Sequence, residues 1–140
     1  MASKNAGLAG LLGGEDSNIL STGNNEIDKK IADGIPLGSL TLIEGENDTG
    51  KSVLTQQIIW GAMKQGLCVD LFSTEMTAKS FLSQMESMSL DVSDYFAWGY
   101  VRLFHLHMVG FKWSKEEMKG ILERIVHHIR SSPAQVIIID

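Results

Sequence analysis

Eight residues, Gly45 to Ser52, follow the pattern GxxxxGKS, and no other feature of the sequence constrains the fold as strongly. An apolar, β-rich run, Ser39–Glu44, precedes them, and a segment with helical periodicity follows. A glycine-rich loop between a strand and a helix is the context in which this pattern forms a phosphate-binding loop, or P-loop. The sequence therefore predicts a nucleotide-binding site at residues 45–52.

Each part of this loop has a physical task. Glycines let the backbone curl so that successive N–H groups point inward, and the following helix adds unpaired N–H donors and the positive end of its dipole. Lys51 adds a positive charge for the outer phosphates, and the Ser52 hydroxyl is a hard oxygen ligand suited to Mg²⁺. The residues predicted to bind the phosphates of ATP are Gly45, Glu46, Asn47, Asp48, Thr49, Gly50, Lys51 and Ser52.

A second part of the magnesium site is predicted where the apolar run Val136–Ile139 precedes Asp140. A buried strand that ends in an acid is the Walker B pattern, whose carboxylate holds Mg²⁺ in P-loop enzymes. The pattern is weak by itself, because any buried strand can end in aspartate. Together with the GxxxxGKS loop, it assigns Asp140 to the magnesium site alongside Ser52.

Glu75 follows the predicted strand Leu67–Ser73, at the carboxyl edge where α/β sheets place their ligands. Two roles are open for this side chain. It is either a catalytic residue that orients or deprotonates an attacking water, or a solvated carboxylate that opens the next helix. We treat Glu75 as a catalytic candidate with that alternative beside it.

Strands and helices alternate along the rest of the sequence. Helical spacing of apolar residues covers Lys51–Gln65, a segment capped by Thr77, and a segment that starts at the Ser114/Glu117 capping box and carries the stripe from Met118 to Ile129. Four strands joined by helices predict an α/β fold with a parallel sheet flanked by helices. The predicted strands are Ser39–Glu44, Leu67–Ser73, Tyr100–His107 and Gln135–Asp140.

Composition narrows the class of partners. The formal net charge is −5, with 12 basic residues against 17 acidic ones, which disfavours direct binding of nucleic acid. No apolar stretch approaches the roughly 20 residues of a membrane span, so no integral membrane segment is expected. The lone Cys68 is typical of a reducing, cytoplasmic setting. Residues 1–18 are rich in Gly, Ala and Ser and predict a flexible leader before a domain that occupies residues 19–140.

Residues 21–140 resemble the KaiC/RecA-type family of P-loop ATPases. Residues 21–28 and 34–38 resemble the lead-in that this family carries before its phosphate loop. The most telling stretch is residues 45–66, together with the sequence STEM at residues 73–76. Both are similar to the branch of the family that serves the archaeal flagellum, or archaellum.

The resemblance implies a RecA/KaiC-like fold and an accessory ATP-binding protein at the cytoplasmic face of the archaellum motor. Its implied partners are the motor ATPase and the membrane platform protein, and it would form a homo-oligomeric ring. Hydrolysis in this branch is expected to be weak or regulatory, and Asp48 stands where most relatives have glycine. By correspondence with the family's motifs, residues 45–52 bind the phosphates, Asp140 is the Walker B acid, and Glu75 matches the glutamate after the second strand.

Two alternatives stay open. One is a recombinase-type ATPase that acts on DNA with Glu75 as base, which the acidic balance disfavours. The other is a fragment without autonomous function, because sheets of this family continue for several strands after Walker B. The next strand in such sheets lies between the Walker A and Walker B strands, so residues 39–44 and 135–139 are not expected to be direct neighbours.

Overall fold

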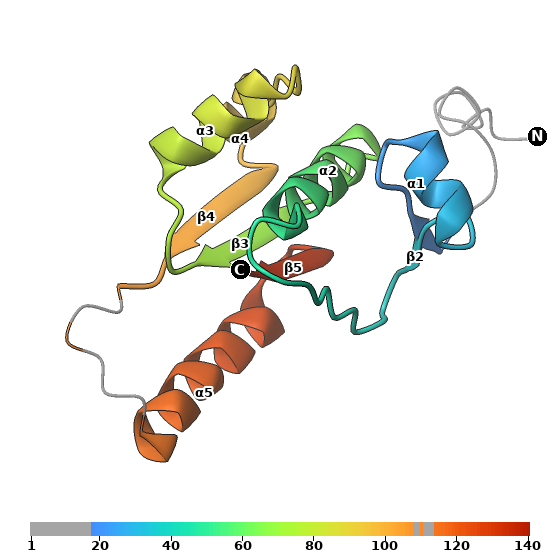
Figure 1. The fold of residues 1–140 in the computed structure, drawn as a ribbon. Helices are drawn as coiled ribbons and strands as arrows, with labels where there is room; N and C mark the ends of the chain where they lie inside the picture. Colours follow the sequence, from blue (N-terminus) through green and yellow to red (C-terminus); the bar gives the residue numbers. More distant parts are fainter. Residues whose placement is uncertain (1–17, 108–109, 111–113) are drawn as a thin grey trace, which may run out of the picture.

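The computed structural model describes residues 18–107, 110 and 114–140. Its main sheet has three parallel strands in the spatial order β4-β3-β5, with helices on both faces (Figure 1). The predicted α/β class is confirmed, while the expected leader at residues 1–18 falls, apart from residue 18, outside the described residues. In chain order the elements are β1 (Ile19–Leu20), α1 (Asn25–Lys30), β2 (Ile35–Pro36), α2 (Lys51–Lys64), β3 (Val69–Ser73), α3 (Ala78–Ser87), α4 (Ser93–Ala97), β4 (Val101–His105), α5 (Lys115–Ser131) and β5 (Val136–Ile139).

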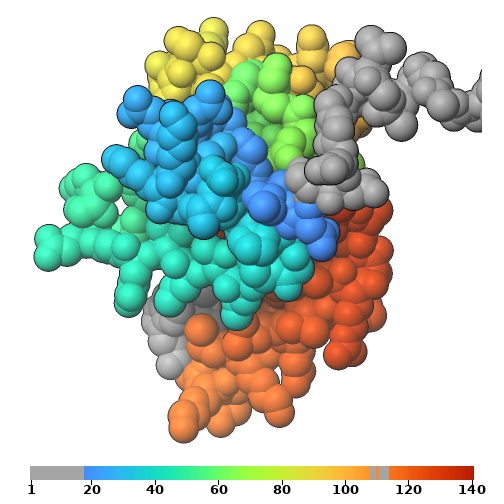
Figure 2. Space-filling model, turned by 90° about the vertical axis from the view of Figure 1, so that its right-hand side faces the viewer, coloured from blue at the N-terminus to red at the C-terminus, as the bar shows by residue number. Residues whose placement is uncertain are grey.

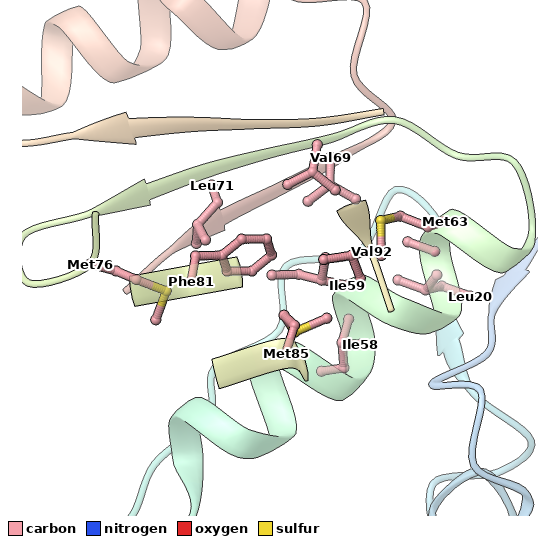
Figure 3. Close-up of a cluster of buried hydrophobic side chains, with 12 residues drawn as sticks. Leu20, Ile58, Ile59, Met63, Val69, Leu71, Met76, Phe81, Met85 and Val92 are labelled. Carbon is pink, nitrogen blue, oxygen red and sulfur yellow. The ribbon is translucent and has the colours of Figure 1, made fainter. Parts of the chain in front are cut away.

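The central strand, β3, is buried along its whole length and presents different chemistry to its two faces. Val69 and Leu71 belong to the apolar core, where Figure 3 shows Leu71 beside Phe81 of α3. Asp70 and Phe72 alternate with them and contact His128 of α5. Successive side chains of a strand point to opposite faces, so β3 requires helices on both sides.

The core lies on the α2 and α3 side of the sheet. Ile58 and Ile59 of α2 pack there with Phe81 and Met85 of α3. Figure 3 shows these side chains converging on one another. Burial of each such side chain contributes roughly 1.5–3 kcal/mol, so this cluster is the main source of the fold's stability.

Two helix starts agree with the capping signals in the sequence. The Thr77 hydroxyl accepts a hydrogen bond from the Ser80 N–H at 3.2 Å and thereby caps α3. The Ser114 hydroxyl accepts one from the Glu117 N–H, also at 3.2 Å, and caps α5. The sequence also predicts a hydrophobic contact between Trp113 and Met118, but Trp113 lies outside the described residues.

Side chains of α2 and its C-cap residue hold the lead-in before the phosphate loop by hydrogen bonds to its backbone. Gln57 Nε2 donates to the Thr22 carbonyl at 2.8 Å, and Gln65 Oε1 accepts from the Ser21 N–H at 2.8 Å. Gly61 faces the same segment so closely that a Cβ there would lie 2.0 Å from the Ser21 carbonyl oxygen. The absence of a side chain at Gly61 is therefore what lets the lead-in lie against the helix.

Buried Asp28 organises the lead-in itself. Its carboxylate accepts hydrogen bonds from the Ser21 hydroxyl at 2.6 Å, the Thr22 hydroxyl at 2.6 Å and the Thr22 N–H at 2.8 Å. Burial alone raises the pKa of Asp28, but these hydrogen bonds outweigh burial and hold the pKa below its ordinary value.

The prediction of a buried strand at Ser39–Glu44 is wrong for the described residues. No strand is assigned to this segment, and Leu40 and Leu42 are 101% and 82% exposed. A β-prone sequence forms a strand only where a neighbouring strand pairs with its backbone, and here a cavity lies between this segment and β5. The expectation that residues 39–44 do not pair with β5 agrees with the sheet order, in which β5 pairs with β3.

Helix α5 covers the face of the sheet opposite α2 (Figure 1), but its predicted apolar stripe is only partly buried. Among the described residues of α5, only Ile125 is buried. Four apolar residues of the stripe remain between 36% and 52% exposed, namely Met118, Leu122, Val126 and Ile129.

A buried ionic cluster joins α5 to the sheet. Asp70, whose side chain is fully buried, accepts two hydrogen bonds from the Arg102 guanidinium at 2.7 and 2.8 Å. The Ser132 hydroxyl at 2.6 Å and His128 Nε2 at 2.7 Å complete its surroundings. Burial alone raises the pKa of Asp70, but the hydrogen bonds from Arg102, Ser132 and His128, with the charge of Arg102, outweigh it and hold the pKa below the ordinary range.

We expect Gly61→Ala to lower the free energy of unfolding by about 2 kcal/mol, because the new methyl group overlaps the Ser21 carbonyl. Urea denaturation measures this change. The matched control is Gly120→Ala in α5, where no described atom lies within 4 Å of the added Cβ. The free energy of unfolding of that variant is expected to rise by up to about 1 kcal/mol, because alanine has a higher helix propensity than glycine. Equal effects of the two substitutions would contradict the close contact at Gly61.

We expect Asp70→Asn to cost about 3 kcal/mol of stability at neutral pH, the lower end for breaking a buried ion pair, because the Arg102 side chain is 39% exposed. The folded-state pKa of Asp70 is lowered, so its contribution is present above the unfolded pKa of about 3.9 and is lost as pH falls through the folded value. The difference between the parent and the variant should therefore shrink in acid, as measured by urea denaturation at a series of pH values. Glu123→Gln, which breaks an exposed pair with Lys119, should cost less than about 1 kcal/mol at any pH.

Candidate functional site

The first turn of α2 offers uncapped backbone donors. Its N-cap residue is Gly50, with φ of 88°, a left-handed conformation that glycine adopts without strain. No side chain caps this end, and no acidic residue lies in the first turn. The N–H groups and the positive end of the helix dipole therefore face outward, as an anion-binding site requires.

Residues 45–49 form a tight turn before this helix. The Thr49 hydroxyl donates to the Glu46 carbonyl at 2.7 Å, and a Cβ on Gly45 would lie 2.7 Å from that hydroxyl oxygen. A side chain at position 45 would therefore displace the Thr49 hydroxyl from this hydrogen bond. Figure 2 shows the teal segment that leads into α2 projecting from the body of the molecule, so the loop is open to a ligand from solution.

Lys51 reaches back over the loop. Its ammonium Nζ donates to the carbonyls of Gly45 at 2.9 Å and Glu46 at 2.5 Å. These contacts hold a positive charge at the mouth of the loop, beside the uncapped N–H groups of α2. That Lys51 binds the outer phosphates of a nucleotide stays a prediction.

Asp140 and Lys51 line the same cavity, which has a volume of about 330 Å³. Asp140 is placed by the sheet, because its N–H donates to the Phe72 carbonyl at 2.8 Å and its own carbonyl accepts from the Thr74 N–H at 3.2 Å. Residues 37–43 and β5 form the walls of this cavity. The tertiary structure therefore brings together two groups that are 89 positions apart in sequence, from 51 to 140.

Ser52 and Glu75 are not among the described residues that line this cavity. Ser52 is exposed in the first turn of α2, next to Lys51. Glu75 is exposed just after β3, where the Ser73 hydroxyl accepts hydrogen bonds from the Glu75 N–H at 3.2 Å and the Met76 N–H at 2.9 Å. The geometry places Glu75 at the carboxyl edge of the sheet and leaves both of its proposed roles open.

Thr55 is a cavity residue that the sequence argument missed. It is buried, lines the cavity with Lys51 and Asp140, and lies one helical turn after Lys51. The spacing from i to i+4 was the available signal, since residues four apart share one face of a helix. The GxxxxGKS pattern stops before this position.

The groups present fit a magnesium nucleotide. Phosphates are matched by an uncapped helix N-terminus, by the tight turn at Gly45 and by the Lys51 ammonium. Hard oxygen ligands for Mg²⁺ are offered by Ser52 and Asp140. Within the described ranges, no group of three or more His, Cys, Asp or Glu side chains forms a metal cage. Mg²⁺ is commonly held by one or two protein groups together with phosphates and water, so the pair is consistent with this ion.

Among the helices of the described part of the chain, none combines the length and the apolar character needed to cross a membrane.

Comparison with known proteins places these features in a family. The family model "ATPase: KaiC" matches residues 20–140. The archaeal flagellar ATP-binding protein FlaH of Sulfolobus acidocaldarius is 36% identical over 122 residues, which cover 87% of this chain and 53% of that protein. FlaH of Methanocaldococcus jannaschii is 32% identical over 116 residues, or 83% of this chain and 49% of that protein.

The fold agrees with a solved structure as well. The crystal structure of flagellar accessory protein FlaH from Methanocaldococcus jannaschii matches with a TM-score of 0.72 and 29% sequence identity, covering 88% of this chain and 54% of that one. The present chain thus spans about half the length of the curated relatives that it matches. Because the family model extends over the lead-in, the phosphate loop, β5 and Asp140, this chain belongs to the KaiC family of ATPases.

Proposed function

We propose that this chain binds ATP together with Mg²⁺ at residues 45–52 and Asp140. The observation that supports this most strongly is the shared cavity of Lys51 and Asp140, next to an uncapped helix N-terminus. A positive charge and open N–H donors favour phosphate, while a carboxylate that lines the same cavity favours a cation. Two relatives named as ATP-binding proteins support the choice of ATP.

Different residues of the proposed site bind the phosphates and the metal ion. Backbone N–H groups of residues 45–52 hold phosphate oxygens, and Lys51 neutralises their charge. To do so its ammonium must exchange its present bonds to the carbonyls of Gly45 and Glu46 for bonds to the ligand. Ser52 and Asp140 would hold Mg²⁺, which supplies positive charge to the phosphates when it is bound.

We further propose that the output of nucleotide binding is assembly, in the archaeal flagellum. The flagellar names of the relatives support this role. In this proposal the chain is part of a homo-oligomeric ring at the cytoplasmic face of the archaellum motor, where ATP biases contacts with the motor ATPase and the membrane platform protein. Hydrolysis is weak or absent, and Glu75 is the residue proposed to support what hydrolysis there is.

We expect Lys51→Ala to weaken ATP binding in the presence of Mg²⁺ by about 10- to 100-fold, because hydrogen bonds to charged groups contribute about 1.5–3 kcal/mol each. Isothermal titration calorimetry measures the affinity. Lys79→Ala, which removes an exposed lysine from α3, is the matched control and should bind as the parent does. Unchanged affinity in Lys51→Ala would remove the site assignment.

Loss of ATP-dependent co-sedimentation with the motor ATPase in the same variant would support the assembly role.

We expect Glu75→Gln to bind ATP within about twofold of the parent, because Glu75 does not line the cavity, and to lose about 100-fold of any hydrolysis. Phosphate release, measured with and without single-stranded DNA, gives both the rate and its dependence on DNA. A variant that hydrolyses ATP at the parent rate would show that Glu75 is only a solvated carboxylate. Fast, DNA-stimulated turnover in the parent would instead favour the recombinase-type alternative.

A further inference from the structure

The phosphate loop carries more negative than positive charge. Glu44, Glu46 and Asp48 lie within five residues of one another, and all three are exposed. Lys51 is the only cationic residue from position 44 to position 52. Its ammonium donates to two backbone carbonyls, and none of the ion pairs found among the described residues involves these three carboxylates. The backbone of the loop attracts anions while its side chains repel them.

Asp48 occupies the turn of the loop itself. It lies between Glu46 and Thr49. The Thr49 hydroxyl donates a hydrogen bond to the Glu46 carbonyl at 2.7 Å, and this bond closes the turn. The φ of Asp48 is 61°, in the left-handed region, and its side chain is exposed. Asp48 therefore brings a negative charge into the loop that would surround the phosphates, two residues before the N-cap of α2.

We infer that Asp48 makes this site selective for metal-complexed nucleotide over free nucleotide. A carboxylate in the loop repels a phosphate chain in proportion to the ligand's net negative charge. Mg²⁺ adds two positive charges to ATP, so the complex loses much less binding energy to that repulsion than the free anion does. The Asp48 charge thus favours the metal complex over the free nucleotide, separately from the Mg²⁺ ligation proposed for Ser52 and Asp140. This inference rests on the proposed nucleotide site.

The test is ATP titration calorimetry on the full chain in Mg²⁺ and in EDTA, extended to millimolar ATP so that weak metal-free binding is measured. We expect Asp48→Asn to bind ATP about fivefold tighter in EDTA and no more than about twofold tighter in Mg²⁺, from the Coulomb energy of one screened charge. Asparagine suits the variant because it tolerates the left-handed backbone. The control is Asp33→Asn, since Asp33 is also exposed, has φ of 69° and does not line the cavity.

Other outcomes overturn the inference in distinguishable ways. An equal change in Mg²⁺ and EDTA, or no change in either, would show that Asp48 does not set the preference. Weaker binding in Mg²⁺ with no gain in EDTA would make Asp48 a metal ligand instead. If Asp48→Asn does not fold, Glu46→Gln replaces it with the same expected direction, because that side chain is exposed and only its backbone carbonyl is used. A parent chain that binds no ATP in either condition refutes the proposed function along with the inference.

Discussion

Burial of β3 on both faces is the constraint on which the rest of the structure depends. All five of its residues are buried, so each face needs a complete covering layer. One layer is apolar and comes from α2 and α3. The other is built around Asp70, a charge that is tolerated there because Arg102, His128 and Ser132 satisfy its oxygens. The two coverings use opposite chemistry to bury one strand.

The candidate site is a consequence of this layered arrangement. Packing of α2 on β3 directs the N-terminus of the helix toward the carboxyl ends of the strands, where Asp140 follows β5 and Glu75 follows β3. The lead-in supports the same helix from its other side through Gly61, Gln57 and Gln65. The loop itself stays exposed, which keeps its N–H donors free for a ligand.

The candidate site contains groups that attract phosphate and groups that repel it, and their balance affects which form of the nucleotide binds. The backbone of residues 45–52 and Lys51 attract phosphate, whereas Glu44, Glu46 and Asp48 oppose a free polyanion. A binding site of this kind responds to the metal complex of the nucleotide and less to the nucleotide alone. Such discrimination suits a component whose proposed output is a change of assembly state, because occupancy then reports both ligands together.

Local patterns in the sequence determined the phosphate loop, the capping residues Thr77 and Ser114, and the alternation of strands and helices. These depend on hydrogen bonds and periodicities that span only a few residues. The tertiary structure alone decided the state of residues 39–44, because a β-prone segment needs a partner strand to become one. It also decided that Lys51 and Asp140 line one cavity and that Asp70 binds Arg102 and His128, since strand order and register join residues that sequence spacing cannot relate.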